Sequence, residues 1–171
     1  YQTFPVYILR QIGEKAPREY ITLINPLAIA TLQLLFTRLT RRLPPVFAMT
    51  LGILVGSGSM LLMGLFPSLL GACASFFVFA VAEMVFSPRY YEYVSSFAPK
   101  GREGLYAGLG LVPSGVGGIA GGILSGRLIG KYLPKGGPLH PLNVWGTYAL
   151  IGVGCALAIG IFGLVTRKKP T

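Results

Sequence analysis

Long stretches without charge are the feature that most limits what this chain can fold into. Residues 43–88 contain a single charged residue in 46, Glu83. Residues 20–37 form an uncharged run of 18, and residues 104–126 form another of 23. A helix of 18 residues is about 27 Å long, close to the thickness of the hydrocarbon core of a bilayer. The pattern therefore predicts helices that cross a membrane.

The overall composition agrees with a membrane protein and argues against a soluble one. The 171 residues are 53% hydrophobic and 12% charged, whereas a soluble domain usually carries about 25% charged residues. The net charge of +10 could suggest binding to nucleic acid. The basic residues are scattered between apolar blocks and form no single basic face, so we expect no nucleic-acid partner.

We expect an all-α membrane protein, a bundle of about six transmembrane helices of which one is truncated. Backbone amides in lipid need partners within their own segment, which favours helices, and the runs lack the alternation of barrel strands. Because the chain begins at Tyr1 inside an apolar run, we expect residues 1–171 to belong to a longer protein. The expected spans are 1–9 (partial), 20–37, 45–65, 68–88 with an extension as far as 97, 104–130 and 143–165.

The connectors differ in basic residues, which predicts the orientation. One set holds Arg38, Arg41, Arg42, Arg89, Lys100, Arg102, Arg167, Lys168 and Lys169. The other holds Arg10, Lys15, Arg18, Lys131 and Lys135, with Arg127 near a helix end. Cytoplasmic connectors carry the excess of Lys and Arg. We therefore expect a multi-pass protein of the cell membrane with a cytoplasmic C-terminus.

Glu83 is the first candidate for a functional residue. An ionised side chain at membrane depth costs at least about 2.5 kcal/mol on insertion scales, and such residues usually face the bundle interior or a water-filled cavity. No counter-charge at matching depth is evident in the sequence. Because desolvation favours the neutral acid, we expect Glu83 to exchange a proton. The alternative is a structural hydrogen bond to a neighbouring helix.

Asn25 is the second candidate, because it precedes Pro26 inside an apolar span. Pro26 removes one helical hydrogen bond, and Pro88 does the same further along by freeing the Met84 carbonyl. Interrupted helices often mark substrate sites and moving parts in transporters. The alternative is an ordinary kink.

Small residues form a stripe on the expected helix 104–130. Gly118, Gly122 and Gly126 recur at intervals of four residues, which allows the close approach of another helix. The stripe predicts either tight packing or a helix that slides against a neighbour, and the sequence does not separate the two.

Metal and enzyme chemistry find little support. Cys73 and Cys155 lie in separate apolar runs, and the only histidine, His140, lies in a connector, so we expect no metal site. An intramembrane serine protease would have hydroxyls at Ser57, Ser59 and Ser114, but no base lies at membrane depth to activate them. We expect neither an enzyme nor a cofactor.

Three stretches resemble segments of the proton-dependent oligopeptide transporter family, within the major facilitator superfamily. Ile24-Asn25-Pro26-Leu27 is similar to the Asn-Pro opening of the family's eighth helix, and Tyr1-Gln2 to the aromatic-Gln segment of its seventh. Ala82-Glu83-Met84, followed by Ser87-Pro88 and Ala98-Pro99-Lys100, is similar to its tenth helix and the exit from it. The chain differs in having no lysine at membrane depth.

The resemblance implies half of a twelve-helix major facilitator fold, whose partner would be a missing N-terminal six-helix half. It implies that Glu83 and Asn25 hold the amino terminus of a bound peptide, with Gln2 and Tyr1 also at the site. We expect secondary active transport by alternating access, with symport of small peptides or similar solutes driven by a proton gradient. Efflux or uptake of drugs or other small metabolites is the alternative, and a scaffold or receptor also stays open.

Overall fold

The structure is a computed structural model that describes residues 3–13 and 16–166. These residues form helices and connectors, without strands, as the sequence predicted. Tyr1 and Gln2, two of the candidate site residues, lie outside the described residues. The elements are α1 (Phe4–Tyr7), the π-helix η1 (Ile8–Ile12), α2 (Arg18–Thr40), α3 (Pro45–Leu65), α4 (Leu69–Ser95), α5 (Glu103–Tyr132) and α6 (Pro141–Val165).

Five of these helices, α2 to α6, are long and apolar enough to cross a membrane. This fits a multi-pass membrane protein. Helix α3 begins and ends at the predicted residues, and α4 continues through Pro88 to Ser95, the longer of the two lengths considered. The truncated first segment, predicted to end at residue 9, continues through η1 to Ile12.

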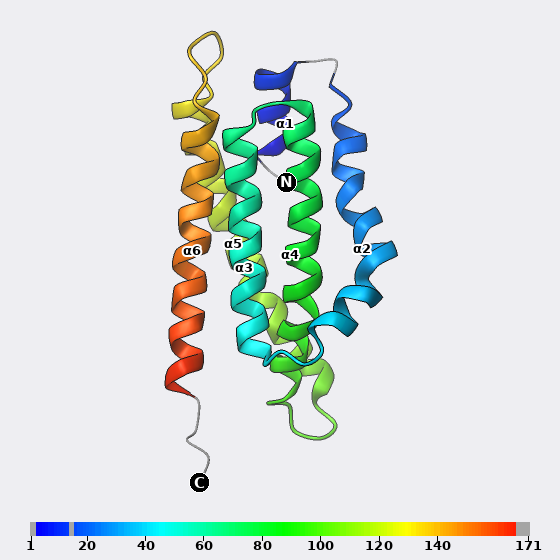
Figure 1. Cartoon of the computed structure of the whole chain (residues 1–171). Coiled ribbons are helices and arrows are strands. Elements are labelled where there is room, and N and C mark those ends of the chain that lie inside the picture. Colours follow the sequence, from blue (N-terminus) through cyan, green and yellow to red (C-terminus); the bar gives the residue numbers. More distant parts are fainter. Residues whose placement is uncertain (1–2, 14–15, 167–171) are drawn as a thin grey trace.

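The helices form a bundle in which α3 occupies the centre (Figure 1). Helix α3 packs against α4 on one side and α6 on the other, and α2 packs on the far side of α4. Helix α5 runs behind them and contacts α4 and α6 much less. Helix α2 is visibly bent, and its lower end swings back towards the base of the bundle.

Helix ends follow local rules of the backbone. Prolines occupy the first position of α3 and α6, where the missing amide would have no helical partner. Ser68 begins α4 by accepting a hydrogen bond from the Gly71 amide at 3.1 Å, as an N-cap residue does. These signals fix short connectors at Phe66–Ser68 and before Pro45.

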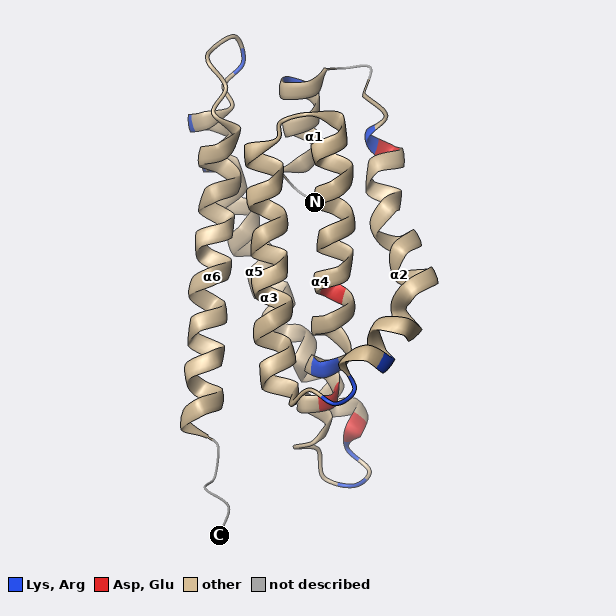
Figure 2. Cartoon of the chain, viewed as in Figure 1, with Lys and Arg blue, Asp and Glu red and all other residues tan. Residues whose placement is uncertain are grey.

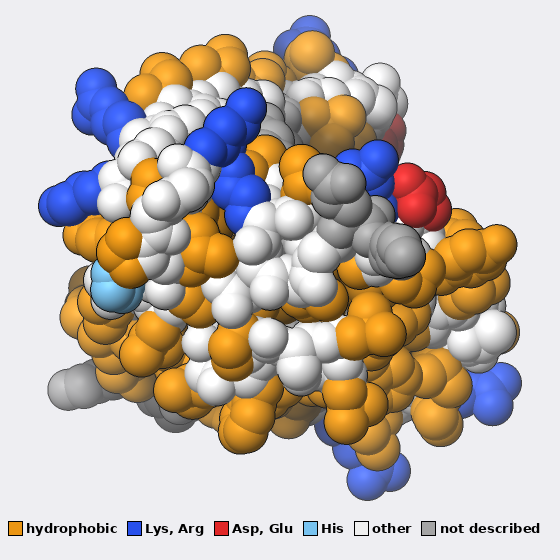
Figure 3. Space-filling model, turned by 90° about the horizontal axis from the view of Figure 1, so that it is seen from above, with side chains coloured by type: hydrophobic (Ala, Val, Ile, Leu, Met, Phe, Trp, Pro, Cys, Tyr) orange, Lys and Arg blue, Asp and Glu red, His pale blue; other side chains and the backbone are white. Residues whose placement is uncertain are grey.

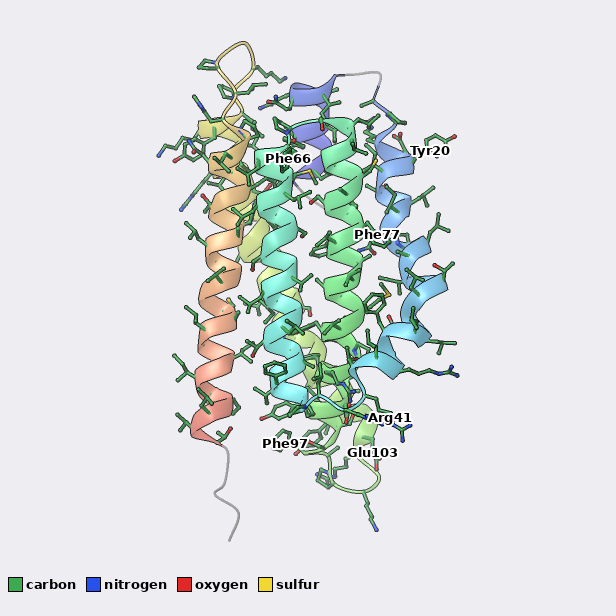
Figure 4. The ribbon with its side chains drawn as sticks, viewed as in Figure 1. Tyr20, Arg41, Phe66, Phe77, Phe97 and Glu103 are labelled. Atoms are coloured by element: carbon green, nitrogen blue, oxygen red, sulfur yellow. The ribbon has the colours of Figure 1, made fainter. Side chains whose placement is uncertain are left out.

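Charged residues gather at the two ends of the bundle, whereas its length is almost uncharged (Figure 2). The exception is the acidic residue part-way along α4. Figure 3 shows lysines and arginines at the upper end, with hydrophobic side chains around the sides. Exposed aromatic residues also mark the ends, with Tyr20 and Phe66 at the top and Phe97 at the bottom (Figure 4). Such aromatic belts are typical of the membrane interface.

Close glycine contacts join α3 to both of its neighbours. A Cβ atom added at Gly52 would lie 2.9 Å from Phe86 Cβ on α4, and one added at Gly64 would lie 3.1 Å from Leu142 Cα on α6. A Cβ added at Gly126 of α5 would meet nothing within 4 Å. The tight approach therefore occurs on α3, whereas a Cβ at Gly118 or Gly126 of the predicted α5 stripe would have open space around it.

Candidate substrate and proton site

Glu83 and Asn25, chosen separately from the sequence, meet in the structure. Asn25 Nδ2 donates a hydrogen bond to Glu83 Oε2 at 3.1 Å, across 58 residues of chain. Asn25 is 4% exposed, and Glu83 is half-buried. The pair joins α2 to α4 part-way along both helices.

Glu83 has no cationic partner in the described part of the chain. The ion pairs there are Arg18–Glu19 and Arg89–Glu92. The carboxylate therefore relies on one amide donor, although an isolated ionised carboxylate in an apolar region is costly. A proton or a cationic ligand group would remove this energetic cost.

The Glu83 side chain also borders a cavity of about 650 Å³ between α3, α4, α5 and α6, which we call the Glu83 cavity. Its wall carries Glu83 as the only charged residue, together with small and aromatic residues. The aromatic residues are Phe79, Phe86, Tyr90, Tyr91 and Tyr148. Asn25 on one side and the cavity on the other thus place the carboxyl group where a solute can reach it.

The kink at Pro88 is stabilised from α2. Pro88 lies inside α4 and leaves the Met84 carbonyl without its helical donor. Gln33 Nε2 approaches this carbonyl at 3.4 Å and also donates to Thr37 Oγ1 at 3.1 Å. In lipid, a carbonyl freed by proline needs such a partner from a neighbouring helix.

Pro26 and Pro113 likewise lie inside continuous helices, α2 and α5. Pro26 follows Asn25 directly and is exposed on the outer side of the helix. Pro113 borders the Glu83 cavity. Three residues before it, the Gly110 carbonyl accepts a hydrogen bond from Tyr90 OH at 2.6 Å. Pro26 is thus linked to the candidate site only through its neighbour Asn25, whereas Pro113 borders the cavity itself.

Tyr90 and Tyr91 follow Pro88 and belong to the same helix as Glu83. Because α4 continues to Ser95, both residues lie on the helix and line the Glu83 cavity. Tyr90 also stacks on Phe86, with the ring centroids 5.5 Å apart. The aromatic run at the end of α4 therefore belongs partly to the site.

Arg89 is a residue that the sequence assigned wrongly to a connector. It lies in α4 and is 7% exposed. Its Nη2 donates to the Thr40 carbonyl at the end of α2 at 2.6 Å, and its Nη1 to Glu92 Oε2 at 2.5 Å. The sequence did contain a signal for a functional or structural role of this residue, because an arginine follows Pro88 directly in a long apolar segment.

The glycine stripe of α5 lies partly on a cavity rather than on a helix. Gly118 lines a second, smaller cavity, whereas Gly122 and Gly126 line neither cavity. The structure therefore separates three residues that the sequence placed in one stripe.

In comparisons with known proteins, no family model and no curated protein sequence matched the chain.

Proposed function

We propose that the chain is the C-terminal half of a secondary active transporter of the major facilitator type, and that it moves small cationic solutes by alternating access. Glu83 exchanges a proton or binds the cationic group of the solute, and Asn25 orients its carboxyl group. The observation that carries the proposal is a carboxylate with no counter-ion among the described residues, held by one amide and bordering a cavity of about 650 Å³.

The first candidate is proton-coupled symport of small peptides. A peptide amino terminus is a compact ammonium group, and a carboxylate that accepts its hydrogen bonds binds it more strongly than a neutral acceptor would. A proton and a cation that compete for one carboxylate would be exchanged across the membrane, so symport requires the coupling proton to bind a second group, supplied by the N-terminal half, while Glu83 holds the ammonium. Binding and release would then couple through one shared cavity.

A second candidate is transport of lipophilic organic cations, as in drug efflux. The residues that line the Glu83 cavity include five aromatic rings but no Lys or Arg. The cavity wall therefore offers no cationic partner to a peptide carboxylate, whereas it suits a cation, which is attracted to aromatic faces. A peptide would need its anionic partner from the N-terminal half.

The test uses the full-length protein in proteoliposomes with an inward proton gradient. Uptake of a labelled dipeptide is compared in wild type, Glu83→Gln and Glu19→Gln. Glu19 is an exposed glutamate whose side chain pairs with Arg18, so it controls for the loss of a carboxylate. We expect gradient-driven uptake in wild type and in Glu19→Gln, and its loss in Glu83→Gln.

Three results would contradict this assignment. Unchanged uptake in Glu83→Gln would remove the role of Glu83. Uptake of a lipophilic cation without uptake of the dipeptide would favour the second candidate. Competition by an N-acetylated dipeptide, which lacks the ammonium group, would show that the cationic group is not what the site recognises.

A further inference from the structure

A second cavity, of about 260 Å³, adjoins the Glu83 cavity, and we call it the aromatic cavity. It lies among α1, α3, α4, α5 and α6. Its aromatic lining consists of Phe4, Phe76, Phe79, Trp145 and Tyr148. Met60, Phe79 and Tyr148 line both cavities, so one wall continues from Glu83 into this second space.

The polar groups in the lining are mostly engaged with one another. Thr3 Oγ1 bonds to Ser125 Oγ at 2.7 Å and to Tyr148 OH at 2.8 Å. Ser75 Oγ donates to the Ser59 carbonyl at 2.6 Å. The lining contains no charged residue. An occupant therefore meets chiefly aromatic rings and methionine side chains, which favour an uncharged group.

One hydrogen-bond donor among the lining residues is unpaired in the described part of the chain. Trp145 Nε1 is buried and has no hydrogen-bond partner in the described part of the chain. Trp145 itself is 5% exposed. Buried polar groups are nearly always paired, but this nitrogen is fully buried and does not face the open space of the cavity, so Trp145 presents its ring and not its donor to an occupant.

Glycines of α5 create the space. Gly117, Gly118 and Gly121 line the aromatic cavity, and a Cβ added at Gly117 or Gly121 would meet nothing within 4 Å. The volume is therefore present because three side chains are missing on this part of α5. A cavity of about 150 Å³ with apolar walls is large enough to bind benzene, so this one has room for a phenyl or isobutyl group.

We propose that the aromatic cavity is a side pocket for the uncharged, bulky group of a solute whose cationic group lies at Glu83. This inference rests on the proposed function and names the solute class for the same site. The preferred solutes are small cations with one aromatic or branched aliphatic substituent. Among dipeptides, those with Phe or Leu would be preferred to dialanine.

The test fills the pocket from α5 by means of Gly121→Leu in the full-length protein. The ratio of kcat/KM for a phenylalanine-containing dipeptide to that for dialanine is measured in proteoliposomes. We expect the ratio to fall at least about tenfold, because even one methylene in an apolar pocket discriminates about 10- to 200-fold. Uptake of dialanine should persist, since Glu83 is untouched.

The matched control is Gly115→Leu, on the same helix. A Cβ at Gly115 also meets nothing within 4 Å, but Gly115 lines neither cavity. This variant should keep the wild-type ratio. An unchanged ratio in Gly121→Leu, with uptake still dependent on Glu83, would overturn the side pocket and leave the proposed function standing. Absence of Glu83-dependent uptake in wild type would instead reject the proposed function.

A binding measurement tests the pocket without transport. Trp145 is the only tryptophan in the chain, so the fluorescence difference between wild type and Trp145→Phe reports on this cavity. Phenethylammonium should change that difference signal, whereas ethylammonium should not. No change with phenethylammonium, together with quenching by lipids brominated on their acyl chains, would assign the cavity to lipid and overturn the proposal.

Discussion

At the scale of single residues, the Glu83–Asn25 pair illustrates how a costly group is retained in an apolar bundle. Placing the carboxylate at membrane depth costs at least about 2.5 kcal/mol on insertion scales. A hydrogen bond to a charged group contributes about 1.5–3 kcal/mol, so the Asn25 amide offsets much of that cost. The remaining exposure to the Glu83 cavity leaves the carboxyl group able to respond to a solute.

Gly152 is a residue at which a single methyl group should matter. A Cβ added there would overlap Ser57 Oγ, so the hydroxyl would have to leave its hydrogen bond to the Ile53 carbonyl or α6 would have to move away from α3. We expect Gly152→Ala to destabilise the protein by about 1–3 kcal/mol, measured as a lower melting temperature in detergent. Gly154→Ala, on the same helix with open space around its Cβ, should leave the melting temperature unchanged.

The clash can be tested by removing its other partner. Ser57→Ala deletes Oγ, so the double variant Ser57→Ala/Gly152→Ala should regain most of the lost stability. The non-additivity of such a cycle measures the contact itself. Equal losses in the presence and absence of the Ser57 hydroxyl would show that the α3–α6 approach differs from the one described.

At the scale of elements, three polar contacts hold α2 against α4 at successive heights. They are Asn25 Nδ2 to Glu83, Gln33 Nε2 to the Met84 carbonyl and Arg89 Nη2 to the Thr40 carbonyl. Between them lies a small apolar cluster of Ala28, Ala80 and Met84. Because lipid is as apolar as the cluster, the polar contacts supply much of the specificity of this helix pair.

Of these three contacts between α2 and α4, the one made by Arg89 should contribute most to stability. Its guanidinium lies at the C-terminal end of α2, where unpaired carbonyls and the helix dipole favour a cation. We expect Arg89→Gln to lower the free energy of unfolding by about 1–3 kcal/mol, measured by thermal denaturation. Arg41→Gln, at an exposed position of the next connector, should have little effect. Similar losses in both variants would indicate a general effect of charge.

The helices could be predicted from the sequence because charges and prolines mark their ends. The predicted bounds of 45–65 coincide with α3, and the choice of Glu83 rested on one charge in a long apolar run. The pairing of helices could not be predicted, because they are apolar on nearly all sides and show no distinct buried face. For the same reason, the prediction placed Arg89 in a connector. The aromatic cavity could not be predicted either, because it forms only where α1, α5 and α6 come together.

At the scale of the whole molecule, the alternation of connectors makes the orientation testable. The α4–α5 connector carries Lys100 and Arg102, and lies at the opposite end of the bundle from the α5–α6 connector. In a variant without Cys73 and Cys155, we expect Ser96→Cys to react with an impermeant maleimide only after cells are permeabilised. Pro138→Cys should react in intact cells. The reverse pattern would place the C-terminus outside the cell.

Helix α5 is the loosest member of the bundle. Large apolar side chains such as Leu109, Val116 and Ile119 are exposed along it, and hydrogen bonds join it to other elements at Gly110 and at Ser125. Between these two points it borders both cavities. A helix that packs only lightly on its neighbours and borders both cavities is well placed to change their width.

The separation of Asn25 and Glu83 along the chain bears on how the protein is made. Their contact spans 58 residues, and ribosomes add about 5–20 residues per second. During synthesis, Asn25 therefore precedes its partner by about 3–12 s at these rates. Throughout that interval α2 carries Asn25 and Gln33 without α4 to receive them. The insertion machinery must accordingly retain α2 beside itself, or shelter it, until α4 has emerged.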